Sequence, residues 1–244
     1  MIEVKNLYKA FGPVVAVEDV SFTAANGAIT GLLGPNGAGK TTTLRMLYTL
    51  LQPGRGSAVI DGYDTASAAL EAQRRVGALP DARGLYPRLT ARENIRYYGR
   101  LHGLKGRELE DNINRLIQWL DLAEVADRRT EGFSTGERLK VAIARALVHG
   151  PQNALFDEPT NGLDVMSTRA MRDFIRRLRE EGKCVVFSSH IMQEVAALCD
   201  HIVIMHRGRV VADGSPEALL QRTGLDSLEE AFVKVIGSEE GLER

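Results

Sequence analysis

The chain has few cysteines and almost no net charge, and both features exclude classes of protein. Its two cysteines, Cys184 and Cys199, form no metal-ligand or redox motif and lie in apolar sequence, so we expect buried, reduced thiols. The formal net charge of −1 gives no electrostatic reason to expect a nucleic acid as partner.

Long apolar runs are also missing. No run approaches the roughly 20 residues that a helix needs to cross a bilayer, and no charged-then-apolar leader opens the chain. These absences predict a cytoplasmic protein, although such a protein can still dock to a membrane protein. A length of 244 residues suffices for one large domain or for a domain with an inserted subdomain.

A glycine-rich motif is the most informative stretch that is present. Gly34 to Thr41 fits G-x-x-x-x-G-K-[ST], the phosphate-binding loop of nucleoside triphosphatases. The apolar run from Ala28 to Leu33 predicts a buried strand before it, and Leu44, Leu47 and Leu51 on one face predict a helix after it. A glycine-rich surface turn is the alternative, but a turn does not require lysine and threonine before an amphipathic helix.

The chemistry of this loop follows from its residue types. Glycines let successive backbone N–H groups turn inward toward phosphate oxygens, and the helix N-terminus adds partial positive charge. We expect Lys40 to reach the β- and γ-phosphates and the Thr41 hydroxyl to bind Mg²⁺.

The order of predicted elements indicates a mixed α/β fold. Strand-like runs at 2–7, 14–22 and 58–61 predict an antiparallel sheet, and the stretch from about Asp81 to Gly150 is helical in pattern. After Gly150 the pattern returns to alternation. Strands are predicted at 153–156 and 183–187, with an amphipathic helix between them, which implies a parallel sheet covered by helices. A hairpin at 201–212 and a last helix opened by Ser227 follow.

Two carboxylates end the strand that starts at Asn153. In a phosphate-loop enzyme, an aspartate at this place holds Mg²⁺, which assigns Asp157 as metal ligand. Glu158 is then placed to act as general base on the attacking water. A strand followed by a charged turn is the plain alternative, and the upstream phosphate loop argues against it. Asn153 is an unusual first residue for a buried strand, so we expect it at an exposed strand start.

Two further positions carry a functional and a structural interpretation side by side. Ser134 and Glu137 form S-x-x-E, a capping box that opens a helix, whereas Gly136 costs helix stability and would let phosphates approach the backbone. His190 follows the strand that ends at Ser189, where ligands bind in open α/β folds. It could hydrogen-bond a γ-phosphate, although a lone histidine is usually structural or solvated.

Taken together, these motifs resemble the ATP-binding subunit of ABC transporters over nearly the whole chain. The resemblance implies an α/β P-loop NTPase fold: a RecA-like core with a mostly parallel sheet, an antiparallel β subdomain and an α-helical insertion. It implies an ATP-binding domain over residues 1–215, a helical subdomain over roughly 82–150 and a helical tail over 216–244. ATP and Mg²⁺ are the implied cofactors.

Site residues follow from the resemblance position by position. Glu158, His190 and Lys40 are implied as catalytic, and Thr41, Asp157 and Asp81 as metal-binding. Phe11 corresponds to the adenine-stacking aromatic, with Tyr8 as the weaker candidate, and Asp164 closes the D-loop that begins at Asn161. The implied nucleotide-binding residues are Phe11, Gly34, Pro35, Asn36, Gly37, Ala38, Gly39, Lys40, Thr41, Thr42, Ser134, Gly136 and Asp164.

The chain departs from the family pattern at three positions. The signature LSGGQ falls on 133–137, where Thr135 and Glu137 replace a glycine and the glutamine, while Ser134 and Gly136 are kept. The Q-loop glutamine falls on Asp81, which adds negative charge beside the triphosphate. These changes affect the expected coupling to a partner more than nucleotide binding.

The partners are also implied by the resemblance. Two ATPase subunits, either two copies or this chain and a paralogue, pair head to tail, so that Ser134 and Gly136 of one complete the site of the other. The tail around 228–232 looks like that of ABC-2 exporters, which implies an ABC-2 permease partner and a location on the cytoplasmic face of the membrane. The segment 82–90 looks most like the sodium-extrusion members. A soluble ABC ATPase of cofactor assembly and a degenerate, non-hydrolysing module are the alternatives.

Overall fold

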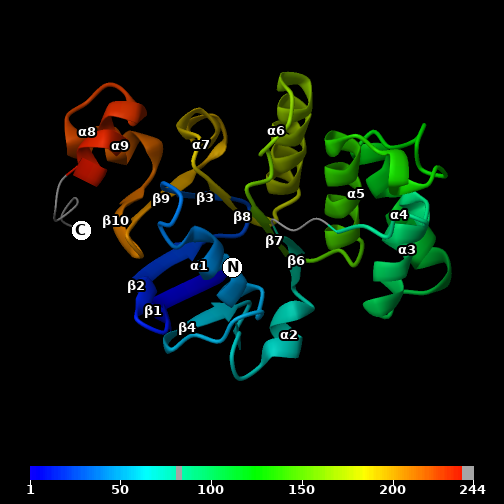
Figure 1. Ribbon diagram of the computed structural model, residues 1–244, viewed down its shortest axis with the longest axis horizontal. Coiled ribbons are helices and arrows are strands. Elements are labelled where there is room, and N and C mark those ends of the chain that lie inside the picture. Colours follow the sequence, from blue (N-terminus) through cyan, green and yellow to red (C-terminus); the bar gives the residue numbers. More distant parts are fainter. Residues whose placement is uncertain (81–83, 238–244) are drawn as a thin grey trace.

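The protein contains two β-sheets, described here from a computed structural model that covers residues 1–80 and 84–237 (Figure 1). A six-stranded sheet has the order β10-β9-β3-β8-β7-β6, with neighbours parallel except at the β9–β10 edge. Its strands are β3 (Ile29–Leu33), β6 (Val76–Leu79), β7 (Asn153–Asp157), β8 (Cys184–Ser189), β9 (His201–His206) and β10 (Arg209–Gly214). The mostly parallel core predicted from the strand–helix alternation is therefore confirmed.

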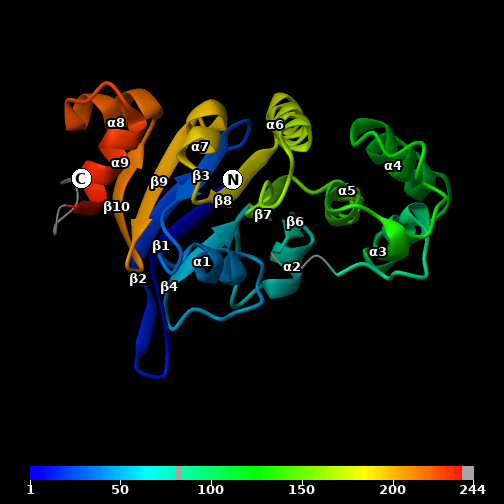
Figure 2. The same cartoon turned by 45° about the horizontal axis from the view of Figure 1, so that its top comes forward.

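The second sheet is antiparallel and uses the first part of the chain. Its order is β2-β1-β4-β5, and its strands are β1 (Ile2–Phe11), β2 (Val14–Ala24), β4 (Arg55–Ile60) and β5 (Tyr63–Asp64). The predicted strands are all present, and the first two are longer than expected because they pair with each other as far as the turn at 12–13. Figure 2 shows this β1–β2 hairpin projecting beyond the rest of the molecule.

Helices form a group at each end of the molecule (Figure 1). The predicted helical segment contains α3 (Ala91–Leu101), α4 (Gly106–Trp119), a 3₁₀ turn at Thr130–Gly132 and α5 (Thr135–Leu147). The opposite end holds α8 (Pro216–Thr223) and α9 (Leu228–Gly237), where the Ser227 hydroxyl accepts from the Glu229 N–H at 3.2 Å. The remaining helices are α1 (Lys40–Leu47), α2 (Ala69–Gln73), α6 (Val165–Glu180) and α7 (Met192–Leu198).

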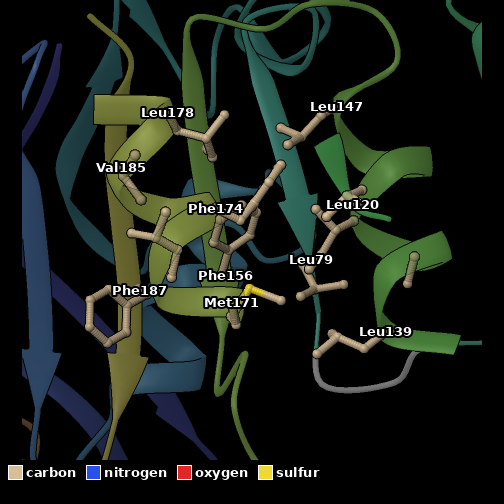
Figure 3. Packing of buried hydrophobic residues seen from close by; sticks show 14 of the residues in the cluster. Leu79, Leu120, Leu139, Leu147, Phe156, Met171, Phe174, Leu178, Val185 and Phe187 are labelled. Carbon is tan, nitrogen blue, oxygen red and sulfur yellow. The ribbon is translucent and has the colours of Figure 1, made fainter. Parts of the chain in front are cut away.

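The two faces of the six-stranded sheet carry separate apolar cores. Successive residues of β7 alternate between them, with Phe156 in one core and Leu155 in the other, as expected where side chains point to opposite faces. Figure 3 shows the first core, in which Phe156, Phe187 and Met171 pack where α5 and α6 cover the sheet. The second core lies between the same sheet, α1 and the antiparallel sheet.

Two local expectations are wrong. The helix after the phosphate loop ends at Leu47, because Thr49 takes a positive φ of 63°, so Leu51 lies outside it while still packing on the second core. Asn153 is not exposed: its side chain is fully buried. Its amide donates to Asp61 Oδ2 at 2.7 Å and to the Arg75 carbonyl at 3.0 Å, which satisfies a polar group that could not otherwise be buried.

Both cysteines are buried free thiols, as predicted. Burial raises the pKa of the Cys184 thiol to about 11, so it remains protonated near neutral pH. Over the described residues, no helix is both long enough and apolar enough to cross a membrane.

Candidate functional site

The phosphate-loop motif joins β3 to α1, which is the strand–loop–helix context expected for it. Gly39 is the residue before α1 and has a φ of 99°, a backbone conformation that side chains rarely adopt. A Cβ at this position would also lie 2.5 Å from the Ala16 carbonyl oxygen. Only glycine therefore allows the loop to bend into α1 this closely against β2.

Lys40 is held at the centre of this loop. Its ammonium donates to the carbonyl oxygens of Gly34 at 2.7 Å and Pro35 at 3.2 Å, and Glu158 Oε1 lies 3.6 Å away. The side chain is only 5% exposed, so burial lowers its pKa, while the charges of Glu158 and Asp157 oppose that change. A concentrated positive charge thus stands among oxygen atoms, at the position expected to meet phosphates.

Asp157 ends β7 directly beneath the loop. Its Oδ1 accepts from the Thr41 hydroxyl at 3.1 Å and from the Ser188 hydroxyl at 2.6 Å, and the residue is 1% exposed. Hydroxyl and carboxylate oxygens are the donors that Mg²⁺ prefers, and Mg²⁺ usually takes one or two carboxylates plus phosphate oxygens and water. The residues present therefore fit a magnesium ion, and they join Thr41 to Asp157 as the sequence predicts.

Glu158 and His190 meet at the ends of neighbouring strands. His190 Nδ1 lies 3.0 Å from Glu158 Oε2, and the Glu158 N–H donates to the Ser188 hydroxyl at 2.9 Å. Glu158 has a φ of 48°, which a residue other than glycine rarely adopts and which is held only where the surroundings fix it. The side chains of Lys40, Glu158 and His190 consequently converge, although 150 residues separate the first from the last.

These groups line an open cleft with a volume of about 470 Å³. Among the predicted residues, Asn36 to Thr42, Glu158 and His190 line this cleft, whereas Gly34, Pro35 and the buried Asp157 do not. Three other lining residues, Val14, Val15 and Ala16, were not predicted, and Asn161 was predicted only as the start of the D-loop. Val14 and Val15 are 62% and 42% exposed, although most other apolar side chains of β2 are buried. Their position directly after the Gly12-Pro13 turn was the sequence signal that could have indicated this exposure.

Phe11 is not among the residues that line the cleft. It ends β1 at the hairpin turn, is 48% exposed, and has the Lys9 ammonium 5.7 Å from its ring centre. Tyr8, the weaker candidate, packs instead against Arg55, whose guanidinium carbon lies 4.3 Å from the ring centre. Of these two aromatic residues, Phe11 is the more exposed one, and it pairs with the cleft residue Val14 at the end of the β1–β2 hairpin.

Ser134 and Gly136 begin α5, outside the cleft. The capping box is present as predicted: the Ser134 hydroxyl accepts from the Glu137 N–H at 3.2 Å, and Glu137 Oε2 accepts from the Ser134 N–H at 2.7 Å. The hydrogen bonds to Ser134 lower the pKa of Glu137. Packing adds a second reason for Gly136, because a Cβ there would lie 3.2 Å from the Ser167 hydroxyl of α6.

Asp164 caps α6 and does not line the cleft. Its carboxylate accepts from the Ser167 N–H at 2.8 Å and from the Ser167 hydroxyl at 2.9 Å, which lowers its pKa. Val165 and Met166, the next two residues, are 83% and 73% exposed. Asp81, predicted as a metal ligand, lies outside the described residues.

Comparisons with known proteins agree with this geometry. Residues 17–161 match the ABC transporter family. The chain is 47% identical to the ABC transporter ATP-binding protein NatA of Bacillus subtilis (strain 168), over 90% of each chain. It is 38% identical to a Nod factor export ATP-binding protein I of Burkholderia lata, over 93% of this chain and 75% of the relative.

Solved structures show the same architecture. An ATP-binding subunit of an ABC transporter superposes with a TM-score of 0.88 at 32% identity, covering 96% of this chain and 98% of the other. A dimeric ATP-binding cassette in a post-hydrolysis state, bound to ADP and Pi, gives a TM-score of 0.80 at 26% identity, over 88% and 98%. The chain belongs to the ABC transporter family, as an ATP-binding subunit that hydrolyses ATP.

Proposed function

We propose that this chain powers an ABC-2 exporter by hydrolysing ATP at the cleft formed by the phosphate loop and the ends of β7 and β8. The convergence of Lys40, Asp157, Glu158 and His190 carries this proposal. It places a cation for phosphate, oxygen donors for magnesium and a carboxylate for water within one small region. A degenerate binding module would not need Glu158 held 3.0 Å from His190.

Different residues of this chain have different roles in ATP hydrolysis. Lys40 and N–H groups of the loop would neutralise the triphosphate, and Thr41 with Asp157 would hold Mg²⁺, which when bound would offset charge on the phosphate oxygens. Glu158 accepts a proton from the water that attacks the γ-phosphorus, while the bond from that phosphorus to the ADP oxygen breaks. His190, in contact with the Glu158 carboxylate, orients that carboxylate and donates a hydrogen bond toward the γ-phosphate.

The functional unit that we propose is a head-to-tail pair of ATPase subunits. Ser134 and Gly136 lie outside the cleft of their own chain, so the cleft contains only one half of the residues implied for the site. The exposed apolar pair Val165 and Met166, next to Asp164, offers a surface that a second subunit would cover. Phe11 and the exposed valines of β2 would border the adenine. The similar ATP-binding cassette bound to ADP and Pi is dimeric, and this supports the proposed pairing of subunits.

We propose an ABC-2 permease as the partner and sodium ions as the cargo. Such a partner implies that the chain lies on the cytoplasmic face of the membrane. The permease would dock on the segment 81–90 together with the helical subdomain. Sodium rests on the resemblance of the 82–90 segment to sodium-extrusion members, and export in general is supported by a relative described as a Nod factor export protein. The full domain assignment, with a core to residue 215 and a helical tail from 216, belongs to the same proposal.

The variant Glu158→Gln tests the catalytic assignment. It keeps the shape of the side chain and removes the base, so we expect kcat to fall at least about 100-fold, the scale of general base catalysis, with ATP affinity retained. Light scattering should then show ATP-dependent doubling of mass, because bound ATP is no longer cleaved. Glu110→Gln, which breaks a surface ion pair with Arg96 in the helical segment, is the matched control and should behave as the unmodified protein. Turnover retained in Glu158→Gln would remove Glu158 as the base.

Cargo is tested separately from catalysis. The chain would be co-purified with its permease, reconstituted in sealed vesicles and supplied with ATP, while a sodium-sensitive dye reports movement of the ion. We expect ATP-dependent sodium transport that Glu158→Gln abolishes. ATP hydrolysis without any movement of sodium would refute sodium as cargo and leave the ATPase assignment intact.

A further inference from the structure

Glu194 is a buried carboxylate that the proposed chemistry does not use. It lies in α7, is only 3% exposed, and no Lys, Arg or His side chain of the described residues forms an ion pair with it. A buried acidic side chain is retained only where its oxygen atoms accept hydrogen bonds. The groups that donate to Glu194 therefore indicate what it does.

Both donors are buried hydroxyls, and both reach the same oxygen atom. Glu194 Oε2 accepts from the Thr160 hydroxyl at 2.5 Å and from the Ser189 hydroxyl at 3.1 Å. The Ser189 oxygen in turn accepts from the Ile191 N–H at 3.0 Å. Because each hydroxyl has one proton, this arrangement fixes the direction of every hydrogen bond around the carboxylate.

The two donors belong to the two segments that carry the reactive side chains. Thr160 lies two residues after Glu158, and Ser189 directly precedes His190. These segments leave neighbouring parallel strands, where Asp157 pairs with Ser188. Ser188 links the strand ends on one side by accepting from the Glu158 N–H, and Glu194 links them again just beyond that point.

We propose that Glu194 is a positioning residue for ATP hydrolysis, which holds the loops after β7 and β8 so that Glu158 and His190 meet. This inference rests on the proposed function of Glu158. The left-handed backbone at Glu158 needs support from both of its sides, and the Thr160–Glu194 hydrogen bond supplies the support after it. Without that hydrogen bond, the Glu158 carboxylate loses its fixed distance to His190, whereas the Gly34 N–H of the phosphate loop keeps its acceptor, the Ser189 carbonyl, at 3.4 Å.

Thr160→Val carries the test, because valine keeps the shape of threonine and removes only the donor. Glu194→Ala would leave two buried hydroxyls without an acceptor, so a loss of folding there would be uninformative. In the purified full-length chain we expect Thr160→Val to lower kcat about tenfold, as small misplacements of catalytic groups do, with KM and the Kd for ATP within about twofold. Thr160→Ser, which restores the hydroxyl, should recover at least about half of kcat.

The controls separate this inference from its premise. Thr30→Val makes the same change at a buried threonine of β3 whose hydroxyl has no hydrogen-bond partner within the described residues, and it should match the unmodified protein. Unchanged kcat in Thr160→Val, with Glu158→Gln inactive, overturns the role of Glu194. Parallel losses of kcat, ATP affinity and thermal stability in Thr160→Val also overturn it, since they indicate general damage. Turnover in Glu158→Gln instead overturns the proposed function itself.

Discussion

A pair of stacked histidines should make the protein sensitive to mild acid. His102 directly follows α3 and His149 lies two residues after α5, and their ring centres lie 3.6 Å apart with the planes within 1° of parallel. The His149 Nε2–H donates to the Val76 carbonyl at 3.2 Å, whereas Nδ1 is buried without a partner in the described part of the chain. Protonation would place a charge on that buried nitrogen, beside a second imidazole.

The free energy involved follows from the pKa of His149. Burial, and then the neighbouring His102, lower it from 6.5 to about 4. Between these values the unfolded chain binds a proton that the folded chain does not, so stability falls as pH decreases from 6.5 toward 4. For one such group, the linkage relation gives a loss of about 1.3 kcal/mol between about pH 7.5 and about pH 5.5.

Urea denaturation at these two pH values measures the effect. His149→Gln keeps a donor for the Val76 carbonyl and cannot titrate, so the unmodified protein should lose about 1.3 kcal/mol more than the variant. Burial also lowers the pKa of His102, but His102→Gln leaves the main cause at His149 in place and should keep most of the difference. Equal losses in the unmodified protein and in His149→Gln would refute a buried, neutral imidazole at this position.

Two other predictions address nucleotide binding and folding. Lys40→Ala removes the buried ammonium and should weaken ATP binding about 10- to 100-fold by calorimetry, the scale of charged hydrogen bonds; unchanged affinity would contradict the loop assignment. Asn153→Ala removes the buried amide that donates to Asp61 Oδ2, while the Arg75 carbonyl still accepts from the backbone N–H of residue 153, and it should lower the free energy of unfolding by about 1–3 kcal/mol. An unchanged free energy of unfolding in Asn153→Ala, measured by urea denaturation, would show that the buried amide is not needed.

Features that depend on neighbours in sequence were predictable. The phosphate loop, with its strand and helix, and the capping box at Ser134 and Glu137 are local patterns whose geometry is set within a few residues. The alternation of strands and helices was enough to give the parallel sheet. The end of α1 was not predictable from the sequence, because it depends on the left-handed backbone of Thr49, which no residue pattern indicated.

Features that depend on distant partners were beyond sequence patterns. Asn153 is buried only because Asp61 and Arg75, about 80 to 90 residues earlier, accept its hydrogen bonds, so its polarity alone gave the wrong expectation. Glu194 is similar: a single glutamate in a short helix is normally solvated, and only the folded chain brings Thr160 to it. The exposed valines of β2 were missed because an apolar strand ordinarily indicates core.

Strand order explains why nucleotide binding and hydrolysis should be separable. The phosphate loop follows β3, His190 follows β8, and Glu158 follows β7, and these strands are consecutive in the sheet order β3-β8-β7. The loop reaches the β7 end through two side-chain contacts, Thr41 to Asp157 and Lys40 to Glu158. Within the described residues, Ser188 and Glu194 join the ends of β7 and β8 through side-chain hydrogen bonds, and the loop contacts the β8 end through the Gly34 N–H, which donates to the Ser189 carbonyl at 3.4 Å. Changes at Lys40 should therefore act on affinity, and changes at Glu158 or Thr160 on turnover; a variant of Thr160 that lost ATP affinity alone would contradict this division.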